Sequence, residues 1–297
     1  MIQINNCPVC GQSKSSHYLT CKDYTVSGTS FNISNCDSCG FKYTNPIPEP
    51  QNLGSYYKSE DYISHSDTNK GLVSKLYKVV RSYTIGKKIK LINKLVSRGT
   101  ILDYGCGTGA FLSACKNDGW KAIGIEPDSG ARNIAGKSLS ELYDSKESLV
   151  KENNSASFNM ITLWHVLEHV VDLQETLKIL TNKLEQDGVM IIAVPNYKSY
   201  DAQHYQEFWA AYDVPRHLYH FDKKSITKLM SLHGFELQNT LPMLFDSFYV
   251  SLLSEKYKSG KSNLIKAFSI GLISNLKALF SRECSSHIYI FKRAKKG

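Results

Sequence analysis

The sequence predicts an α/β protein with a doubly wound parallel sheet, an antiparallel last strand and a small cysteine-rich module at its N-terminus. Three observations support this prediction. Strand-like apolar runs alternate with helical patterns from about residue 97 to residue 244. A glycine-rich loop follows the first of these runs, at residues 105–109. Two Cys-x-x-Cys-Gly knuckles precede the sheet, within residues 7–40.

Composition sets the broad class of the protein. The chain has 297 residues, 42% of them hydrophobic, which is enough for one α/β domain and a small accessory module. Lysine and arginine exceed the acidic residues by 36 to 27, and the net charge of +9 favours an anionic partner. The basic residues are nevertheless spread along the chain, as on a solvated surface. The sequence has no uninterrupted apolar run of about 18 residues and no N-terminal signal pattern, so we expect a cytoplasmic protein.

The two knuckles predict a zinc ribbon over residues 1–45. In each knuckle a glycine (Gly11, Gly40) follows the second cysteine and permits the positive φ of a tight turn. Short alternating strands at Tyr18–Thr20 and Ser30–Ile33 fit between them. Four thiolates make a closed tetrahedral site, so the metal is expected to stabilise the fold and not to catalyse. The predicted Zn²⁺ ligands are Cys7, Cys10, Cys36 and Cys39.

Residues 46–96 are predicted to form a linker and a helical flap. Three prolines within residues 46–50 give a rigid, extended exit from the ribbon, and a helical pattern runs from about Gly71 to Val96. Three tyrosines and a histidine lie between these parts: Tyr56, Tyr57, Tyr62 and His65. Two interpretations remain open for them, a flap over a ligand pocket or packing of the ribbon against the sheet.

The stretch from Thr100 to Gly109 predicts a nucleoside site. An apolar strand ends there in glycines at positions 105, 107 and 109, and a helical pattern starts at Ala110. This arrangement lets backbone N–H groups and a helix N-terminus approach a ligand closely. Glu126 ends the second strand, where a carboxylate grips a ribose diol in doubly wound sheets.

Asp103 distinguishes between two kinds of nucleotide. The pattern Gly105-x-Gly107-x-x-Ala110 formally satisfies the dinucleotide fingerprint. Asp103, however, places a negative charge two residues before the first glycine, where it would repel a pyrophosphate and attract an ammonium or a sulfonium. S-adenosylmethionine carries both cations and no phosphate, so we expect it as the cofactor.

This stretch resembles the first motif of class I S-adenosylmethionine-dependent methyltransferases, an acid followed by Gly-x-Gly-x-Gly, with a ribose acid ending the next strand. The segment 164–169 (Trp-His-Val-Leu-Glu-His) and the later Pro-Arg-His at 215–217 are similar to motifs of the branch that acts on sugars, quinones and other small molecules. A zinc ribbon is a known companion of that branch. The resemblance covers roughly residues 95–240. It implies a Rossmann-like methyltransferase domain that transfers a methyl group to oxygen or carbon of a small or carrier-bound molecule.

Further strands and helices complete the expected domain, which we place at residues 97–244 and 285–297. Strands are predicted at 120–125, 139–143, 158–163 and 189–194, and an antiparallel last strand at 286–291. Polar residues at the ends of these strands are expected to converge on one site. The predicted cofactor-binding residues are Asp103, Gly105, Gly107, Gly109, Glu126, Asp144, Trp164 and His165.

A hydroxyl or acidic carbon acceptor needs a base, and histidine titrates near neutral pH. The sequence offers His165, His169 and His217 as candidates and does not choose among them.

Residues 245–284 form a predicted helical insertion before the last strand. Its apolar residues recur at helical spacing in two stripes with lysines interspersed. Three interpretations stay open: a lid on the acceptor pocket, a dimer surface, or a helix lying on an anionic membrane.

Two rival functions remain. A nucleic-acid substrate would use the ribbon and the basic surface. It is disfavoured because no Asn-Pro-Pro-Tyr follows the fourth strand and no Pro-Cys dipeptide is present. A non-catalytic protein that binds S-adenosylmethionine is the other rival. The oligomeric state is not predicted by the sequence.

Overall fold

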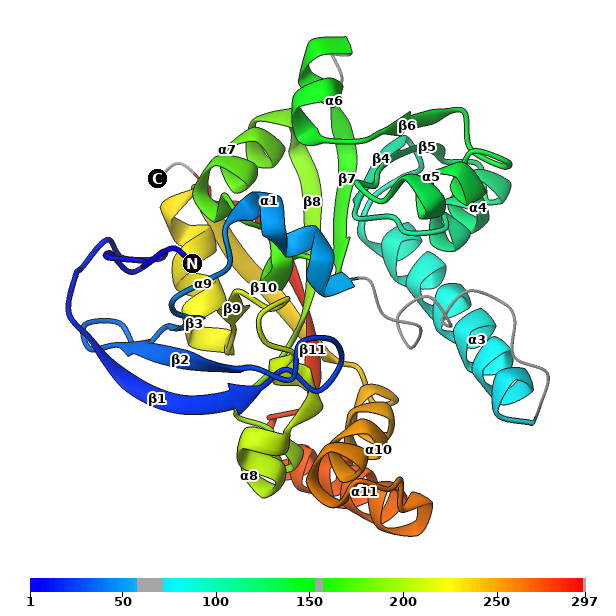
Figure 1. Ribbon diagram of the computed structural model, residues 1–297. Coiled ribbons are helices and arrows are strands. Elements are labelled where there is room, and N and C mark those ends of the chain that lie inside the picture. The colour runs from blue at the N-terminus through cyan, green and yellow to red at the C-terminus, as the bar shows by residue number, and fades with distance from the viewer. Residues whose placement is uncertain (58–71, 153–156, 296–297) are drawn as a thin grey trace.

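A twisted sheet of seven strands forms the centre of the molecule (Figure 1). The computed structural model describes residues 1–57, 72–152 and 157–295. Within these residues the strand order is β10-β11-β8-β7-β4-β5-β6. The strands are β4 (Thr100–Tyr104), β5 (Lys121–Ile125), β6 (Glu141–Tyr143), β7 (Phe158–Trp164), β8 (Leu184–Pro195), β10 (Phe235–Pro242) and β11 (Ser286–Arg293).

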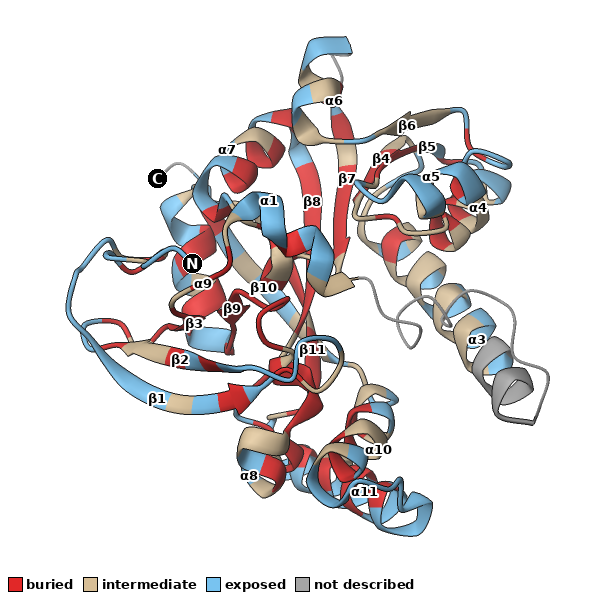
Figure 2. Cartoon of the chain, viewed as in Figure 1, coloured by how far each residue is buried: buried red, intermediate tan, exposed pale blue. Residues whose placement is uncertain are grey.

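The strand directions confirm the predicted fold class. The neighbours from β8 through β7, β4 and β5 to β6 are parallel, whereas β11 is antiparallel to both β8 and β10. Strand β7 and the part of β8 from residue 189 to 194 are mostly buried and mostly apolar, as expected for strands covered on both faces (Figure 2). The last strand is therefore inserted between β8 and β10, as a Rossmann-like methyltransferase sheet requires.

Helices connect the strands and cover the sheet. They are α3 (Leu72–Leu95), α4 (Ala110–Asn117), α5 (Ser129–Ala135), α6 (Lys146–Glu152), α7 (Leu173–Lys183) and α9 (Lys223–Leu232). Asp128 caps α5 by accepting a hydrogen bond from the N–H of Ala131, and Asp222 with Ser225 forms a capping box on α9. The sequence therefore fixes these helix starts locally.

The N-terminal module shares its sheet with the rest of the chain. Strands β1 (Ser15–Lys22), β2 (Ser30–Cys36) and β3 (Lys42–Thr44) pair in that order, and β9 (Tyr219–His220) adds a fourth strand beside β3. Cys36 and Phe41 also belong to the same buried cluster as the central sheet. After β3 come α1 (Pro50–Leu53) and a 3-10 turn, η1 (Gly54–Tyr57). Residues 58–71 of the expected flap, with Tyr62 and His65, lie outside the described residues, so the flap stays a prediction.

The insertion is helical, as the sequence predicts. It contains α10 (Asp246–Ser259) and α11 (Leu264–Ser281), which pack against α8 (Tyr200–Tyr205) at one end of the molecule (Figure 1). Short 3-10 turns complete the chain: η2 (Leu167–His169), η3 (Gln206–Phe208) and η4 (Ala210–Tyr212).

Candidate active site

The three glycines after β4 have different structural tasks. All three have positive φ: 73° at Gly105, 56° at Gly107 and 75° at Gly109. A Cβ atom at Gly105 would lie 2.5 Å from Val166, and one at Gly109 would lie 2.9 Å from Ala135. A Cβ atom at Gly107 would meet nothing within 4 Å. The outer glycines are therefore required by close packing, and the middle one leaves open backbone that a ligand can approach.

Glu126 stands at the end of β5, directly beside this open backbone. One carboxylate oxygen accepts a hydrogen bond from the N–H of Gly107 at 2.8 Å, and the other accepts from the N–H of Asp128 at 2.9 Å. Burial raises the pKa of Glu126, although these backbone hydrogen bonds oppose the shift. The carboxylate is thus fixed at the position where a ribose diol is held in doubly wound folds.

Asp103 is buried one strand away and faces a cation. The hydroxyl of Thr162 donates to its carboxylate at 2.6 Å. Burial raises the pKa of Asp103 to about 7, and Thr162 and the ammonium of Lys88 act in the opposite direction. The negative charge at this edge of the sheet attracts positively charged groups, as the sequence analysis expects.

Lys88 reaches this site from α3 and was not foreseen by the sequence analysis. Its Nζ lies 3.8 Å from the centroid of the Trp164 ring, a cation–π geometry. Burial lowers the pKa of Lys88 to about 8, with Asp103 and Asp246 opposing. No local pattern marks this lysine, because it belongs to a helix whose sequence reads as ordinary surface.

Trp164 and Asp144 end two other strands of the sheet. Trp164 packs edge-on against Phe111, and its indole N–H is buried without a hydrogen-bond acceptor among the described residues. Asp144 is exposed at the end of β6, and its carboxylate accepts from the hydroxyl of Ser145. Asp144 therefore lies at the predicted edge, but no contact joins it to the glycine loop.

His165 is held between two carboxylates and has a positive φ of 56°. Its Nε2 lies 3.0 Å from Asp246 and its Nδ1 lies 3.4 Å from Glu168. Burial alone lowers the pKa of His165, but the hydrogen bonds and charges of Asp246 and Glu168 raise it to about 10 overall. This imidazole is therefore protonated at neutral pH and suits charge stabilisation better than proton abstraction. Asp246 comes from the insertion and was not foreseen.

Glu168, His169 and His217 form a buried cluster. Each offers one ligand-type atom, and these atoms lie within 4.8 Å of one another, a donor set that also fits a divalent cation. The Glu168 side chain is 1% exposed, and its carboxylate pairs with the His165 Nδ1 at 3.4 Å, a long contact for a hydrogen bond. Such a buried carboxylate favours a positive charge on a neighbouring imidazole.

The two histidines of this cluster differ in their partners. The Nδ1 of His217 lies 2.8 Å from the carbonyl oxygen of Ala211, so this nitrogen carries a proton, and in the neutral imidazole the lone pair is then on Nε2. The Nδ1 of His169 lies 3.0 Å from both the Arg216 carbonyl and the Tyr57 hydroxyl. Burial, followed by the charge of His217, lowers the pKa of His169 to about 4.

The Pro-Arg-His segment that carries His217 is tied to the N-terminal module. The Arg216 guanidinium pairs with Asp213 at 2.6 Å and with Asp23 of the module at 3.3 Å. The hydroxyl of Thr44, at the end of β3, donates to the carbonyl of His217 at 2.7 Å. The module thus fixes the position of one candidate base, although it contributes no side chain to the cluster itself.

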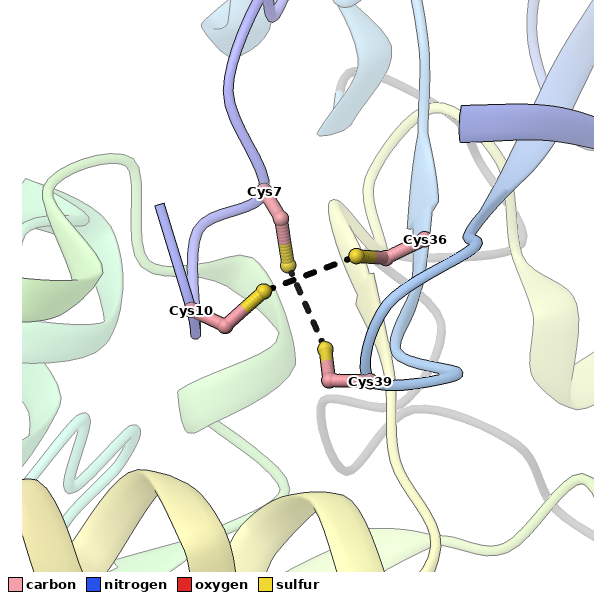
Figure 3. A group of neighbouring side chains, drawn as sticks. All are labelled: Cys7, Cys10, Cys36 and Cys39. Carbon is pink, nitrogen blue, oxygen red and sulfur yellow. Dashed lines mark hydrogen bonds between the residues drawn. The ribbon is translucent and has the colours of Figure 1, made fainter. Parts of the chain in front are cut away.

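The four knuckle cysteines come together at one point, as the sequence predicts (Figure 3). The Cys7 and Cys39 sulfurs are 3.6 Å apart, and the Cys10 and Cys36 sulfurs are 3.5 Å apart. Four sulfurs at the corners of a tetrahedron around Zn²⁺, each about 2.3 Å from the metal, would be about 3.8 Å from one another. The sulfurs are too far apart for disulfides, which require about 2.05 Å. Their arrangement fits a four-thiolate metal site.

Comparisons with known proteins agree with this architecture. A family model described as a methyltransferase domain matches residues 80–240. The chain is similar to the ubiquinone biosynthesis O-methyltransferase of Rickettsia typhi, with 27% identity over 152 residues, 47% of this chain and 59% of the relative. It is also similar to the enzyme of that name from Azorhizobium caulinodans, with 26% identity over 157 residues, 49% of this chain and 62% of the relative. The chain thus spans less than two thirds of these relatives.

A solved structure extends the similarity of fold. The magnesium protoporphyrin IX methyltransferase from Synechocystis PCC 6803, with bound SAH, superposes with a TM-score of 0.54. The alignment covers 83% of this chain and 100% of that chain, at 13% identity. At this identity the similarity concerns the fold alone.

Proposed function

This chain belongs to the methyltransferase-domain family, and we propose that it transfers a methyl group from S-adenosylmethionine to an oxygen or carbon of a small or carrier-bound molecule. The observation that carries the proposal is the open backbone at Gly107, with the Glu126 carboxylate bonded beside it and Asp103 one strand away. A nucleoside with cationic substituents matches both charges.

Each residue of this site has a separate role in the proposal. S-adenosylmethionine, when bound, supplies a methyl group already activated on its sulfonium. Glu126 accepts hydrogen bonds from the ribose hydroxyls, and Gly107 leaves room for them. Asp103 favours the positive charges of the ligand. The ammonium of Lys88 lies over the face of the Trp164 ring. This contact indicates that the surroundings of Trp164 favour a positive charge.

We propose His217 as the base that deprotonates the acceptor. Donation from its Nδ1 to the carbonyl of Ala211 leaves the Nε2 lone pair available, and Glu168 stabilises the imidazolium that forms. Positioning of the acceptor in line with the methyl group supplies most of the remaining acceleration. His169 lies against His217 with ring centroids 4.5 Å apart and bounds the same cluster.

The acceptor is proposed to be a sugar, a quinone or a lipid-linked metabolite. The name of the similar proteins, ubiquinone biosynthesis O-methyltransferase, supports an oxygen acceptor. The buried Glu168 and His217 favour a neutral hydroxyl that loses its proton during transfer.

We also propose that Cys7, Cys10, Cys36 and Cys39 hold a structural Zn²⁺. The close approach of the four sulfurs supports this assignment, and four thiolate ligands leave no coordination position for a substrate. The metal would hold the module that braces the loop of His217.

The test is incubation of the purified full chain with methyl-labelled S-adenosylmethionine and fractionated cell extract. We expect label in the small-molecule, carbohydrate or lipid fraction, and its loss in Glu126→Gln and His217→Asn. The variant Glu175→Gln, at an exposed position of α7, is the matched control and is expected to retain activity. Label confined to RNA, or cofactor binding without transfer to any fraction, would contradict the proposal.

A further inference from the structure

Helix α11 is packed with its small side chains inward. Its buried face carries Ala267, Ile270, Gly271, Ser274 and Ala278, of which Ile270 alone is large. A Cβ atom at Gly271 would lie 2.8 Å from the ring of Phe248, so α10 approaches the α11 backbone closely. In a helix that packs as part of a soluble core, the large apolar residues usually occupy the inner face.

The outer face of α11 instead carries large apolar side chains. Ile265 is 82% exposed and Phe280 is 90% exposed. Only 28% of the 18 residues of α11 are buried, and among the described helices it is the one long and apolar enough to cross a membrane by length and composition. The exposed large residues that follow helical spacing on this face are Ile265, Phe268, Leu272, Leu276, Leu279 and Phe280.

Basic residues border this apolar face. Residues 256–282 contain six lysine or arginine residues and no acidic residue. Lys258 and Lys261 lie before the helix, and Arg282 lies directly after it, all three exposed. Lys266, which pairs with Glu255 at 3.0 Å, and Lys277 are eleven residues apart, about three helical turns, so they lie along one flank. The face thus combines exposed aliphatic and aromatic groups with positive charge at both ends.

We propose that the outer face of α11 docks the protein on the surface of an anionic lipid bilayer. Leu, Ile and Phe side chains beside lysines suit a helix lying in the plane of the interface. The alternative occupant, a second copy of this chain in a two-fold interface, would bring the same basic segment against itself, and like charges repel. Anionic lipids complement both the charge and the apolar surface.

The helix lies on the bilayer and does not cross it. Asp201 is buried, and its carboxylate accepts hydrogen bonds from the hydroxyls of Ser274 and Ser285 and from the indole N–H of Trp209. If α11 moved into the bilayer core, Ser274 would no longer donate its hydrogen bond to the buried Asp201 carboxylate, and the loss would cost free energy. A helix that lies on the bilayer surface keeps this hydrogen bond. Helix α10, against which α11 packs, begins at Asp246, the partner of His165.

The test is co-flotation of the full chain with vesicles, measured without any methyl acceptor. One set contains phosphatidylcholine alone and the other an equal mixture with phosphatidylglycerol. We expect at least about tenfold more protein on the anionic vesicles and a comparable loss in the double variant Ile265→Asp/Phe280→Asp. Both substituted side chains are exposed, so the variant is expected to fold.

The matched control is Val26→Asp/Leu232→Asp, which adds the same charge at exposed apolar positions elsewhere and is expected to bind like the unchanged protein. Equal flotation of both double variants, or absence of flotation with anionic vesicles, would overturn the proposal. A dimer in solution that only the α11 variant dissociates, without vesicle binding, would also overturn it. Because flotation requires no turnover, its result is independent of whether the proposed methyl transfer is correct.

Discussion

The methyltransferase sheet has two additions, the N-terminal module (residues 1–45) and the helical insertion (residues 245–284). They differ in whether their large side chains are buried or exposed. The module turns Phe41 and Tyr43 inward, where they join the buried cluster of the central sheet. The insertion packs mostly through small residues on α11, with Ile270 the one large exception, and leaves Ile265 and Phe280 in solvent. The module is therefore built to brace the domain, and the insertion presents a surface.

Both additions contact residues of the candidate site. The module holds the loop of His217 through Thr44 and through the pairing of Asp23 with Arg216. The insertion supplies Asp246, which keeps His165 protonated. The comparison predicts that damage to the module reduces stability and turnover together, and that substitutions on the outer face of α11 affect neither.

The largest effect is expected from loss of a cysteine ligand. In Cys7→Ser, the zinc content should fall and the free energy of unfolding should drop by about 3 kcal/mol or more, because the site loses a thiolate. Chemical denaturation and metal analysis measure the two quantities. Ser38→Ala, an exposed change in the other knuckle, is the control. A Cys7→Ser protein that is fully stable and free of metal would refute the structural-zinc proposal.

The next effect concerns the link between module and loop. Asp23→Asn removes one charge from the buried pairing with Arg216, so we expect a loss of about 1–3 kcal/mol and a fall in kcat, with unchanged affinity for S-adenosylmethionine. Burial raises the pKa of Asp23, but hydrogen bonds from Ser27 and the charge of Arg216 lower it overall, so the ion pair is present at neutral pH. Asp37→Asn, at an exposed position of the same module, should change neither quantity. Unchanged kcat in Asp23→Asn would contradict the bracing role.

A smaller effect is expected on the inner face of the insertion. Gly271→Ala adds a Cβ atom 2.8 Å from the Phe248 ring and 3.0 Å from its Cα. Overpacking of this kind costs about 1–3 kcal/mol, which exceeds the gain in helix propensity. Thermal unfolding measures the loss. Increased stability in Gly271→Ala would show that α10 and α11 are not packed closely.

The smallest effect is expected on the outer face. Ile265→Asp should change the free energy of unfolding by less than about 0.5 kcal/mol, because the side chain is 82% exposed. Thermal unfolding in the absence of lipid is again the measurement. A loss comparable to that in Gly271→Ala would mean that this face is covered within the protein, and the contrast between the two additions would disappear.

Local features of the chain were predictable from the sequence. The glycines after β4 are recognisable because a tight loop needs residues that adopt positive φ. The cysteine knuckles are recognisable because their spacing suits a tetrahedral metal site. The strand–helix alternation is likewise a local periodicity, and it led to the correct sheet.

Features that depend on distant segments were not predictable. The strand β9 at Tyr219–His220 pairs with β3 across more than half of the sequence, and nothing in a two-residue strand signals its partner. Lys88 and Asp246 reach the site from helices. The apolar pattern of a helix predicts which of its faces is buried, but not which distant residues its polar side chains contact. In α11 both faces are apolar, so its periodicity alone could not indicate which face is buried.

The proposed function requires a cationic nucleoside at the glycine loop, and calorimetry of S-adenosylmethionine binding at different pH values tests this requirement most directly. Burial raises the pKa of Asp103 to about 7, so the carboxylate that attracts the ligand forms as the pH rises through that value. The affinity should therefore increase up to about pH 7, by about tenfold per pH unit well below it, and then level off. Asp103→Asn should bind weakly and without this dependence. Tight binding by Asp103→Asn with an unchanged pH profile would contradict the assignment of the cofactor site.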